Sequence, residues 1–142
     1  MGLMGAAAVI LNQNGEVLLV KHTYGKCNWE IPGGRAEDSE SPVDTAIREV
    51  REETGLIVAA QHMTGYYYDS SAGGLHFVFR CELQVGADAA LPDGEEVSEC
   101  GYWRPEALPR PISDFTVLRI QDALAGANYP LPTIIGPRQW LD

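Results

Sequence analysis

The sequence predicts a single α/β domain over residues 1–142, with one mixed sheet lying between helices. The predicted elements follow the order strand, strand, helix, several strands, helix, which is the order of mixed α/β layers. The chain has 142 residues, of which 45% are hydrophobic. A chain of this length and apolar content can bury one core without disulfide or metal cross-links.

The chain is predicted to open with a β-hairpin. Residues 6–11 and 16–21 are strand-like runs, and the Asn14-Gly15 pair between them favours the left-handed conformations of a tight hairpin turn. Residues 22–39 contain several Gly and Pro breakers, so this segment is predicted to be a loop that leads into the next element.

The next predicted element is a helix that ends at Gly55. Ser41 is its expected N-cap, and Pro42 occupies the first-turn position that proline tolerates. Apolar residues then follow at helical spacing, and they are Val43, Ala46, Ile47 and Val50. One stripe of this helix is therefore expected to face the core.

The second half of the chain contains further strands and a second helix. Apolar and polar residues alternate from position 75 to Val85, which is the pattern of a strand with one buried face. Shorter strands are predicted at 57–60, 62–68 and 99–104. Ser113 is the expected N-cap of a helix that ends near Leu124, with Val117, Ile120 and Leu124 on its inward face. The Pro-rich tail after Asn128 is predicted to be irregular.

Charge and cysteine content exclude several classes of protein. Twenty acidic against ten basic residues give a net charge of −10, which repels a nucleic-acid backbone or an anionic membrane. The three cysteines lack CxxC spacing and indicate neither a disulfide framework nor a zinc site. No apolar run approaches the roughly twenty residues that span a bilayer. We therefore expect a cytoplasmic protein with a small phosphorylated partner, and neither a long nucleic acid nor a membrane.

Three carboxylates are the first candidates for chemistry. Glu49, Glu52 and Glu53 fall within an arc of about 100° on the predicted helix. Like charges at this spacing destabilise a helix by roughly 0.2–0.5 kcal/mol per pair, and anions in the last turn oppose the helix dipole. A hard cation such as Mg²⁺, shared between carboxylates and substrate phosphates, removes this repulsion. The alternative is a solvated charged face, with Arg48 and Arg51 as ion-pair partners.

The residues around the helix favour the metal site. They match the pattern G-x5-E-x7-R-E-U-x-E-E-x-G-U, where U is aliphatic, at Gly34, Glu40, Arg48, Glu49, Val50, Glu52, Glu53, Gly55 and Leu56. At average residue frequencies this match would rarely arise by chance. The stretch resembles the Nudix box, and the resemblance extends more loosely along the whole chain.

The resemblance implies an α/β/α sandwich that hydrolyses a nucleoside diphosphate linked to another moiety, with Mg²⁺ or Mn²⁺ as cofactor. Matched by position, the metal ligands would be Glu49, Glu52 and Glu53, with the backbone carbonyl of Gly33. Arg48 would orient one of the carboxylates, and Gly34 and Glu40 would have accessory roles. The resemblance is also compatible with a homodimer.

A general base must take a proton from the attacking water. Metal ions neutralise charge at the attacked phosphorus and lower the pKa of a bound water. Glu53 is one candidate base. The resemblance also implies a base on a later loop, where the chain has Glu95, Glu96 and Glu99; the Glu-Val pair ahead of Trp103 favours Glu96. A solvated acidic loop is the alternative for each of these three residues.

Substrate recognition is less well defined by the sequence. Trp29, Tyr66 and Tyr68 can stack a nucleobase, although core packing explains them equally well. Arg35, Lys21 and Lys26 flank the predicted site and can hold phosphates, with ordinary solvated charge as the alternative. The three histidines are isolated, which favours surface or packing roles.

Three functions therefore remain open for this chain. The first is hydrolysis of a nucleoside diphosphate linked to a group X, which releases a mononucleotide and phosphorylated X. The second is a (deoxy)nucleoside triphosphate pyrophosphohydrolase that removes damaged nucleotides. The third is a nucleotide-sensing module without turnover. The intact acidic triad favours an enzyme over the sensing module.

Overall fold

The structure is a computed structural model that describes residues 3–84, 89–126 and 133–142. Its strands are β1 (Leu3–Ile10), β2 (Val17–His22), β3 (Trp29–Glu30), β4 (Gly33–Arg35), β5 (Val58–Asp69), β6 (Gly74–Leu83), β7 (Val97–Trp103), β8 (Ile112–Ser113), β9 (Thr133–Ile135) and β10 (Trp140–Leu141). Its helices are α1 (Pro42–Thr54) and α2 (Asp114–Ala125). Neither helix is long and apolar enough to cross a bilayer.

The strands form two five-stranded sheets instead of the single sheet that we expected. The first sheet has the order β4-β1-β6-β5-β9 and is mixed, because β1 runs parallel to β6 and β5 runs parallel to β9. The second sheet has the order β10-β8-β3-β2-β7. The predicted α/β class with a mixed sheet is confirmed.

The predicted opening hairpin is wrong in its pairing, although its turn forms. Gly15 has φ 76° and donates its N–H to the carbonyl of Asn12 at 3.1 Å. Beyond the turn, β1 and β2 share only the bridge between Leu11 and Val17. Residues 6–10 of β1 are all buried, so this strand lies inside the first sheet between β4 and β6. It pairs with β6 along its whole length and with β4 at residues 5–7, whereas β2 joins the second sheet.

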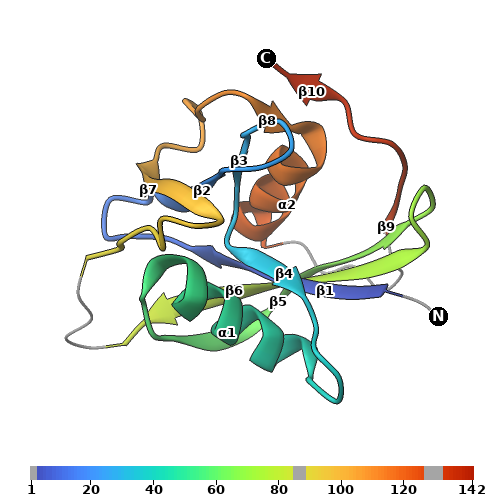
Figure 1. The fold of residues 1–142 in the computed structure, drawn as a ribbon, viewed down its shortest axis with the longest axis horizontal. Coiled ribbons are helices and arrows are strands. Elements are labelled where there is room, and N and C mark those ends of the chain that lie inside the picture. The colour runs from blue at the N-terminus through green and yellow to red at the C-terminus, as the bar shows by residue number, and fades with distance from the viewer. Residues whose placement is uncertain (1–2, 85–88, 127–132) are drawn as a thin grey trace.

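The two faces of β1 contact different layers of the molecule. Ala8 belongs to the core cluster that includes Val50 of α1, whereas Ala7 belongs to the cluster that includes Phe115 and Ile120 of α2. This division follows from the alternation of side chains along a strand. Figure 1 shows α1 below the first sheet, with α2 and the second sheet above it.

Both helices begin at the predicted caps. The Ser41 hydroxyl accepts the N–H of Asp44, and the left-handed Gly55 ends α1. The Ser113 hydroxyl likewise accepts the N–H of Thr116 at the start of α2. The predicted inward face of α2 is wrong at Leu124, which is 41% exposed. Ile120 is buried as predicted and Val117 is half-buried, and the other buried residues of α2 are Phe115, Thr116, Arg119, Asp122 and Ala123.

The other differences from the expected elements involve short or irregular strands. The predicted loop at 22–39 contains β3 and β4, and the two strands predicted at 57–68 form the single bulged strand β5. The predicted irregular tail contributes β9 and β10, each to a different sheet. Val85 and Asn128 lie outside the described residues.

Candidate active site

Two consecutive glycines bring β4 against the acidic helix. The N–H of Gly33 donates to the Glu53 carboxylate at 2.9 Å. A Cβ at Gly33 would lie 2.5 Å from the Cβ of Ala7, and a Cβ at Gly34 would lie 2.6 Å from the Glu49 carboxyl carbon. A side chain at Gly33 would clash with the backbone of β1, and a side chain at Gly34 would displace the Glu49 carboxylate, so the two glycines let β4 lie beside β1 and against α1.

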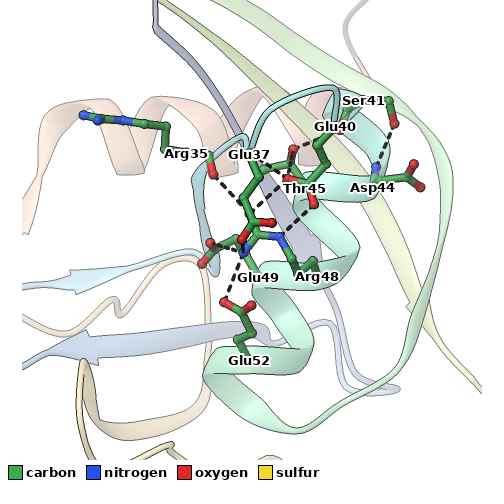
Figure 2. Close-up of polar contacts among 9 residues, drawn as sticks. All are labelled: Arg35, Glu37, Glu40, Ser41, Asp44, Thr45, Arg48, Glu49 and Glu52. Carbon is green, nitrogen blue, oxygen red and sulfur yellow. Dashed lines mark hydrogen bonds and ion pairs between the residues drawn. The ribbon is translucent and has the colours of Figure 1, made fainter.

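Arg48 lies at the centre of a carboxylate network on α1 (Figure 2). Its guanidinium donates to both oxygens of Glu40 at 2.7 and 3.0 Å, to Glu49 at 2.9 Å and to Glu52 at 3.1 Å. It also donates to the backbone carbonyl of Arg35 at 3.1 Å. The bonds from Arg48 hold the pKa of Glu40 at about 2. Arg48 therefore ties the loop before α1 to two of the three predicted metal ligands.

Glu53 is the most buried of the three predicted metal ligands. It is 4% exposed, and burial raises the pKa of its carboxyl to about 8 against the opposing N–H bond from Gly33. Burial also raises the pKa of Glu49, and the hydrogen bond and charge of Arg48 act against this increase. A carboxylate in this environment lacks the solvation that it would have in water, so a bound cation would stabilise its charged form.

The acidic side chains fit a divalent cation by donor type. Carboxylate oxygens and a backbone carbonyl are the ligands that Mg²⁺ prefers. Within the described residues, no three His, Cys, Asp or Glu side chains already converge on one point. Glu49 and Glu52 each bond to Arg48 through one carboxylate oxygen, which leaves the other oxygen of each to coordinate a cation.

A cavity of about 380 Å³ lies beside the glycine strand. Gly33 and Gly34 line it at the end near the acidic helix, together with Tyr24. The charges of Glu53 and Glu96 add to the effect of burial in raising the pKa of Tyr24, so this ring lies close to the acids. The cavity therefore begins where the acidic face of α1 ends.

The cavity floor is the face of the first sheet that α1 does not cover. Gly5 and Ala7 of β1 line it, and they pair with Arg35 and Gly33 on one side and with His76 and Val78 on the other. Small residues on this face leave room for a ligand above the sheet.

A family model described as the NUDIX domain matches residues 2–119, which is most of this chain. The chain belongs to the Nudix family. It is an enzyme of the Nudix pyrophosphohydrolase type, and the predicted family membership is confirmed.

Individual relatives agree with this assignment. The chain is 31% identical over 125 residues to a MutT-like protein of Streptomyces ambofaciens, covering 88% of this chain and 79% of that protein. It is 31% identical over 125 residues to 8-oxo-dGDP phosphatase NUDT18 of Mus musculus, and this match covers 86% of this chain and 38% of that protein. An ADP-ribose pyrophosphatase from Streptococcus suis has the same fold, with a TM-score of 0.73 at 22% identity, covering 96% of this chain and all of that one.

The predicted substrate-binding residues of this Nudix chain lie in different environments. Arg35 is exposed and lines the cavity. Trp29 is 7% exposed and packs edge-on against Trp103, with ring centroids 5.4 Å apart, so it lies in the core. Tyr66 stacks on Phe77, and Tyr68 is 40% exposed; neither is part of the cavity lining.

The loop acids also differ in their surroundings. The charge of Glu96 adds to burial in raising the pKa of Glu49. Glu99 forms an ion pair of 3.9 Å with Lys21. The backbone carbonyl of Glu95 accepts the hydroxyl of Thr23 at 2.6 Å. Of these three residues, Glu96 is the one whose charge acts on the acidic helix.

Several residues that line the cavity were not predicted from the sequence to be site residues. They are His22, Tyr24, His76, Phe115, Arg119 and Arg138. Arg119 had a signal in the sequence, because an arginine falls on the helix face that also carries the apolar Phe115 and Ile120. Arg138 had none, because it lies in a tail that was expected to be irregular.

Proposed function

We propose that this Nudix enzyme hydrolyses the diphosphate bond of a nucleoside diphosphate linked to another group, with Mg²⁺ or Mn²⁺ as its cofactor. The observation that carries the proposal is that the buried Glu53 and the half-buried Glu49 lie against Gly33 and Gly34, two residues that line a cavity of about 380 Å³. Attack of water on one phosphorus releases a mononucleotide and the phosphorylated second group.

Each residue near the acidic helix has a role in this proposal. Glu49, Glu52 and Glu53 hold the cation, with the backbone carbonyl of Gly33 as a further ligand. Arg48 holds Glu49 and Glu52 in place until the cation binds, and Glu40 anchors Arg48. A divalent cation bound there neutralises charge on the diphosphate and lowers the pKa of the attacking water.

The proton of the attacking water must be accepted by a carboxylate. Glu53 and Glu96 are the two candidates, because the charges of both act on Tyr24, which lines the cavity. We assign Glu53 mainly to the cation, which requires its charged form, and Glu96 to the proton. A base on an exposed loop can move toward the substrate, whereas Glu53 is fixed by Gly33.

Hydrolysis of a damaged nucleoside triphosphate is the second candidate function. The 8-oxo-dGDP phosphatase relative favours a damaged nucleotide as the substrate, and a putative 8-oxo-dGTP diphosphatase of Bacillus subtilis, 32% identical to this chain over 119 residues, favours a triphosphate. The site chemistry is the same in both cases, because water attacks a phosphorus of an anhydride beside the same acids. The two functions differ only in the group that leaves.

A panel of nucleotides tests the proposal. The protein is incubated with Mg²⁺ and nucleoside diphosphate sugars, ADP-ribose, or normal and oxidised nucleoside triphosphates, and the released phosphate compounds are identified. We expect mononucleotide release that Glu52→Gln and Glu53→Gln each reduce strongly, while the exposed Glu106→Gln has no effect. Nucleotide binding without hydrolysis under any divalent ion would instead support the sensing module.

We also propose that residues 1–142 act as one domain in a reducing cytoplasm. The three cysteines are free, and Cys81 is buried, where burial raises the pKa of its thiol to about 11 and makes it inert.

A further inference from the structure

The cavity wall includes a residue from outside the matched family domain. The NUDIX match ends at residue 119, yet Arg138, between β9 and β10, lines the cavity. This side chain lies at the end of the cavity formed by Asp69, Ala72 and Gly74, where β5 turns into β6. The acidic helix meets the cavity at Gly33 and Gly34, on strand β4 of the same sheet.

Arg138 is held in place by a buried carboxylate. Its Nη1 donates to Asp69, which is 3% exposed, at 3.1 Å, and to the carbonyl of Gly136 at 3.1 Å. The guanidinium carbon lies 4.5 Å from the ring centroid of Phe115. These contacts fix the plane of the guanidinium. No hydrogen bond from its Nε or Nη2 is found among the described residues.

The polar groups at this end of the cavity are balanced in charge. Asp69 neutralises Arg138, and Glu30 neutralises Arg119 at 2.6 Å. His76 also lines this wall, and burial with the charges of Arg119 and Arg138 lowers its pKa to about 4, so it is neutral near pH 7. A second phosphate would therefore meet no net positive charge here.

The wall around Arg138 offers donors more than acceptors. One oxygen of Asp69 accepts the N–H and hydroxyl of Ser71 and the N–H of Ala72, and the other oxygen bonds Arg138. Both Asp69 oxygens are thus already bonded. A ligand that displaces water from the remaining N–H groups of Arg138 must supply an acceptor, because a desolvated donor without a partner is costly.

We propose that Arg138 is a substrate-binding residue that donates to the carbonyl oxygen of an oxo-nucleobase. This inference rests on the proposed function, because the base reaches Arg138 when the phosphate end of the nucleotide lies beside the acidic helix. A carbonyl suits the wall, since it is an uncharged acceptor. An exocyclic amine at the same position would face N–H groups instead, so adenine nucleotides bind less well than hypoxanthine or guanine nucleotides.

The test compares the mononucleotides IMP and AMP, which differ at C6 in carrying an oxo or an amino group. A mononucleotide is released whichever diphosphate compound is cut. Binding of each to the full chain is measured by isothermal titration calorimetry with Mg²⁺. We expect IMP to bind about tenfold more tightly than AMP, the scale of one well-placed donor and acceptor pair.

Variants of arginine separate binding from folding. Arg138→Met keeps the apolar stem over Phe115 but removes the donors, and we expect it to weaken IMP binding to the level of AMP while leaving AMP unchanged. Arg104→Met, at an exposed position, is the matched control and should change the binding of neither IMP nor AMP. Arg138→Lys retains the charge without the planar donor pair and should give an intermediate preference.

The outcomes distinguish this inference from the proposed function. Glu53→Gln should lose turnover and keep the preference for IMP. Equal binding of IMP and AMP by the wild-type protein, no measurable IMP binding, or an equal loss of both ligands in Arg138→Met would overturn the role of Arg138. A wild-type protein that prefers IMP but hydrolyses nothing would overturn the proposed function alone.

Discussion

Glu53 has a proposed role in catalysis, and its buried carboxyl also decreases the stability of the metal-free protein. Its carboxyl is buried and lies close enough to Glu49 and Glu30 for their charges to disfavour its ionisation. Glu53→Gln keeps an oxygen that can accept the N–H of Gly33 and removes the charge. We expect Glu53→Gln to raise the melting temperature of the metal-free protein and to lower kcat by at least about 100-fold.

Calorimetry with chelator, and then with Mg²⁺, checks this prediction. Mg²⁺ should raise the melting temperature of the wild-type protein and have a smaller effect on Glu53→Gln, because binding to the folded state stabilises it. Equal stabilisation of both proteins by Mg²⁺ would contradict a metal-binding role for Glu53.

His76 makes stability depend on pH in the acid range. Burial and the neighbouring Arg119 and Arg138 lower its pKa from 6.5 to about 4. The unfolded chain therefore binds the proton first as the pH falls, so His76 decreases stability between about pH 6.5 and pH 4. His76→Gln should flatten this decline.

Urea unfolding at pH 7 and pH 5 measures the effect. The control is His62→Gln, because His62 is exposed on β5. The His62 variant should lose as much stability between the two pH values as the wild-type protein. A decline that is unchanged in His76→Gln would show that other groups carry the pH dependence.

The acidic residues could be predicted from sequence because their relation is local. Glu49, Glu52 and Glu53 share one helix, and helical geometry alone places them on one face. Arg138 could not be predicted, because its partners Asp69 and Phe115 lie far from it in the sequence and meet it only in the folded chain. Trp29 was predicted to bind substrate because it lies next to the motif. An aromatic residue suits a core equally well, and the fold buries Trp29 against Trp103.

At the scale of elements, β4 depends on having no side chain at Gly33. A Cβ there would lie 2.6 Å from the carbonyl oxygen of Ala6, which is backbone and cannot rotate away. We expect Gly33→Ala to destabilise the fold by roughly 1–3 kcal/mol and to reduce activity by displacing the N–H that bonds Glu53. Gly101→Ala in β7 is the matched control, since its nearest atom is 3.9 Å away.

Urea unfolding and kcat of the two glycine variants check this prediction. Gly101→Ala should keep both values close to those of the wild-type protein. Wild-type stability in Gly33→Ala would mean that β4 tolerates a shift away from β1.

The elements differed in how well their sequences defined them. Both helices have capping residues that act locally, so Ser41, Gly55 and Ser113 marked their boundaries correctly. Strand pairing is not local. Asn14-Gly15 identified a turn but not the strands that pair on either side of it. The sheet that β1 joins is decided by the burial of both faces of β1. The short strands β3, β9 and β10 have only two or three residues and no period to detect.

At the scale of the whole molecule, the C-terminal segment connects the two sheets. Its strand β9 extends the first sheet beside β5, and β10 extends the second sheet beside β8. The carbonyl of Ile135 accepts both the N–H and the hydroxyl of Ser70, at 2.8 and 2.7 Å. This segment follows the matched family domain, yet it covers two sheet edges and supplies Arg138.

Two truncations separate these contributions. A chain that ends at residue 132 loses β9, β10 and the partner of the buried Asp69. Each lost hydrogen bond contributes about 1 kcal/mol, and several are lost, so we expect a large decrease in the free energy of unfolding together with loss of the preference for IMP over AMP. A chain that ends at Gln139 loses only β10 and keeps Arg138 and the bonds between Gln139 and Asp114. It should lose less stability in urea and retain the preference, because β9 still closes the first sheet and Asp69 still holds Arg138. If the longer truncated chain also lost the preference, the position of Arg138 would depend on β10, and the contact with Asp69 alone would not be enough to hold it.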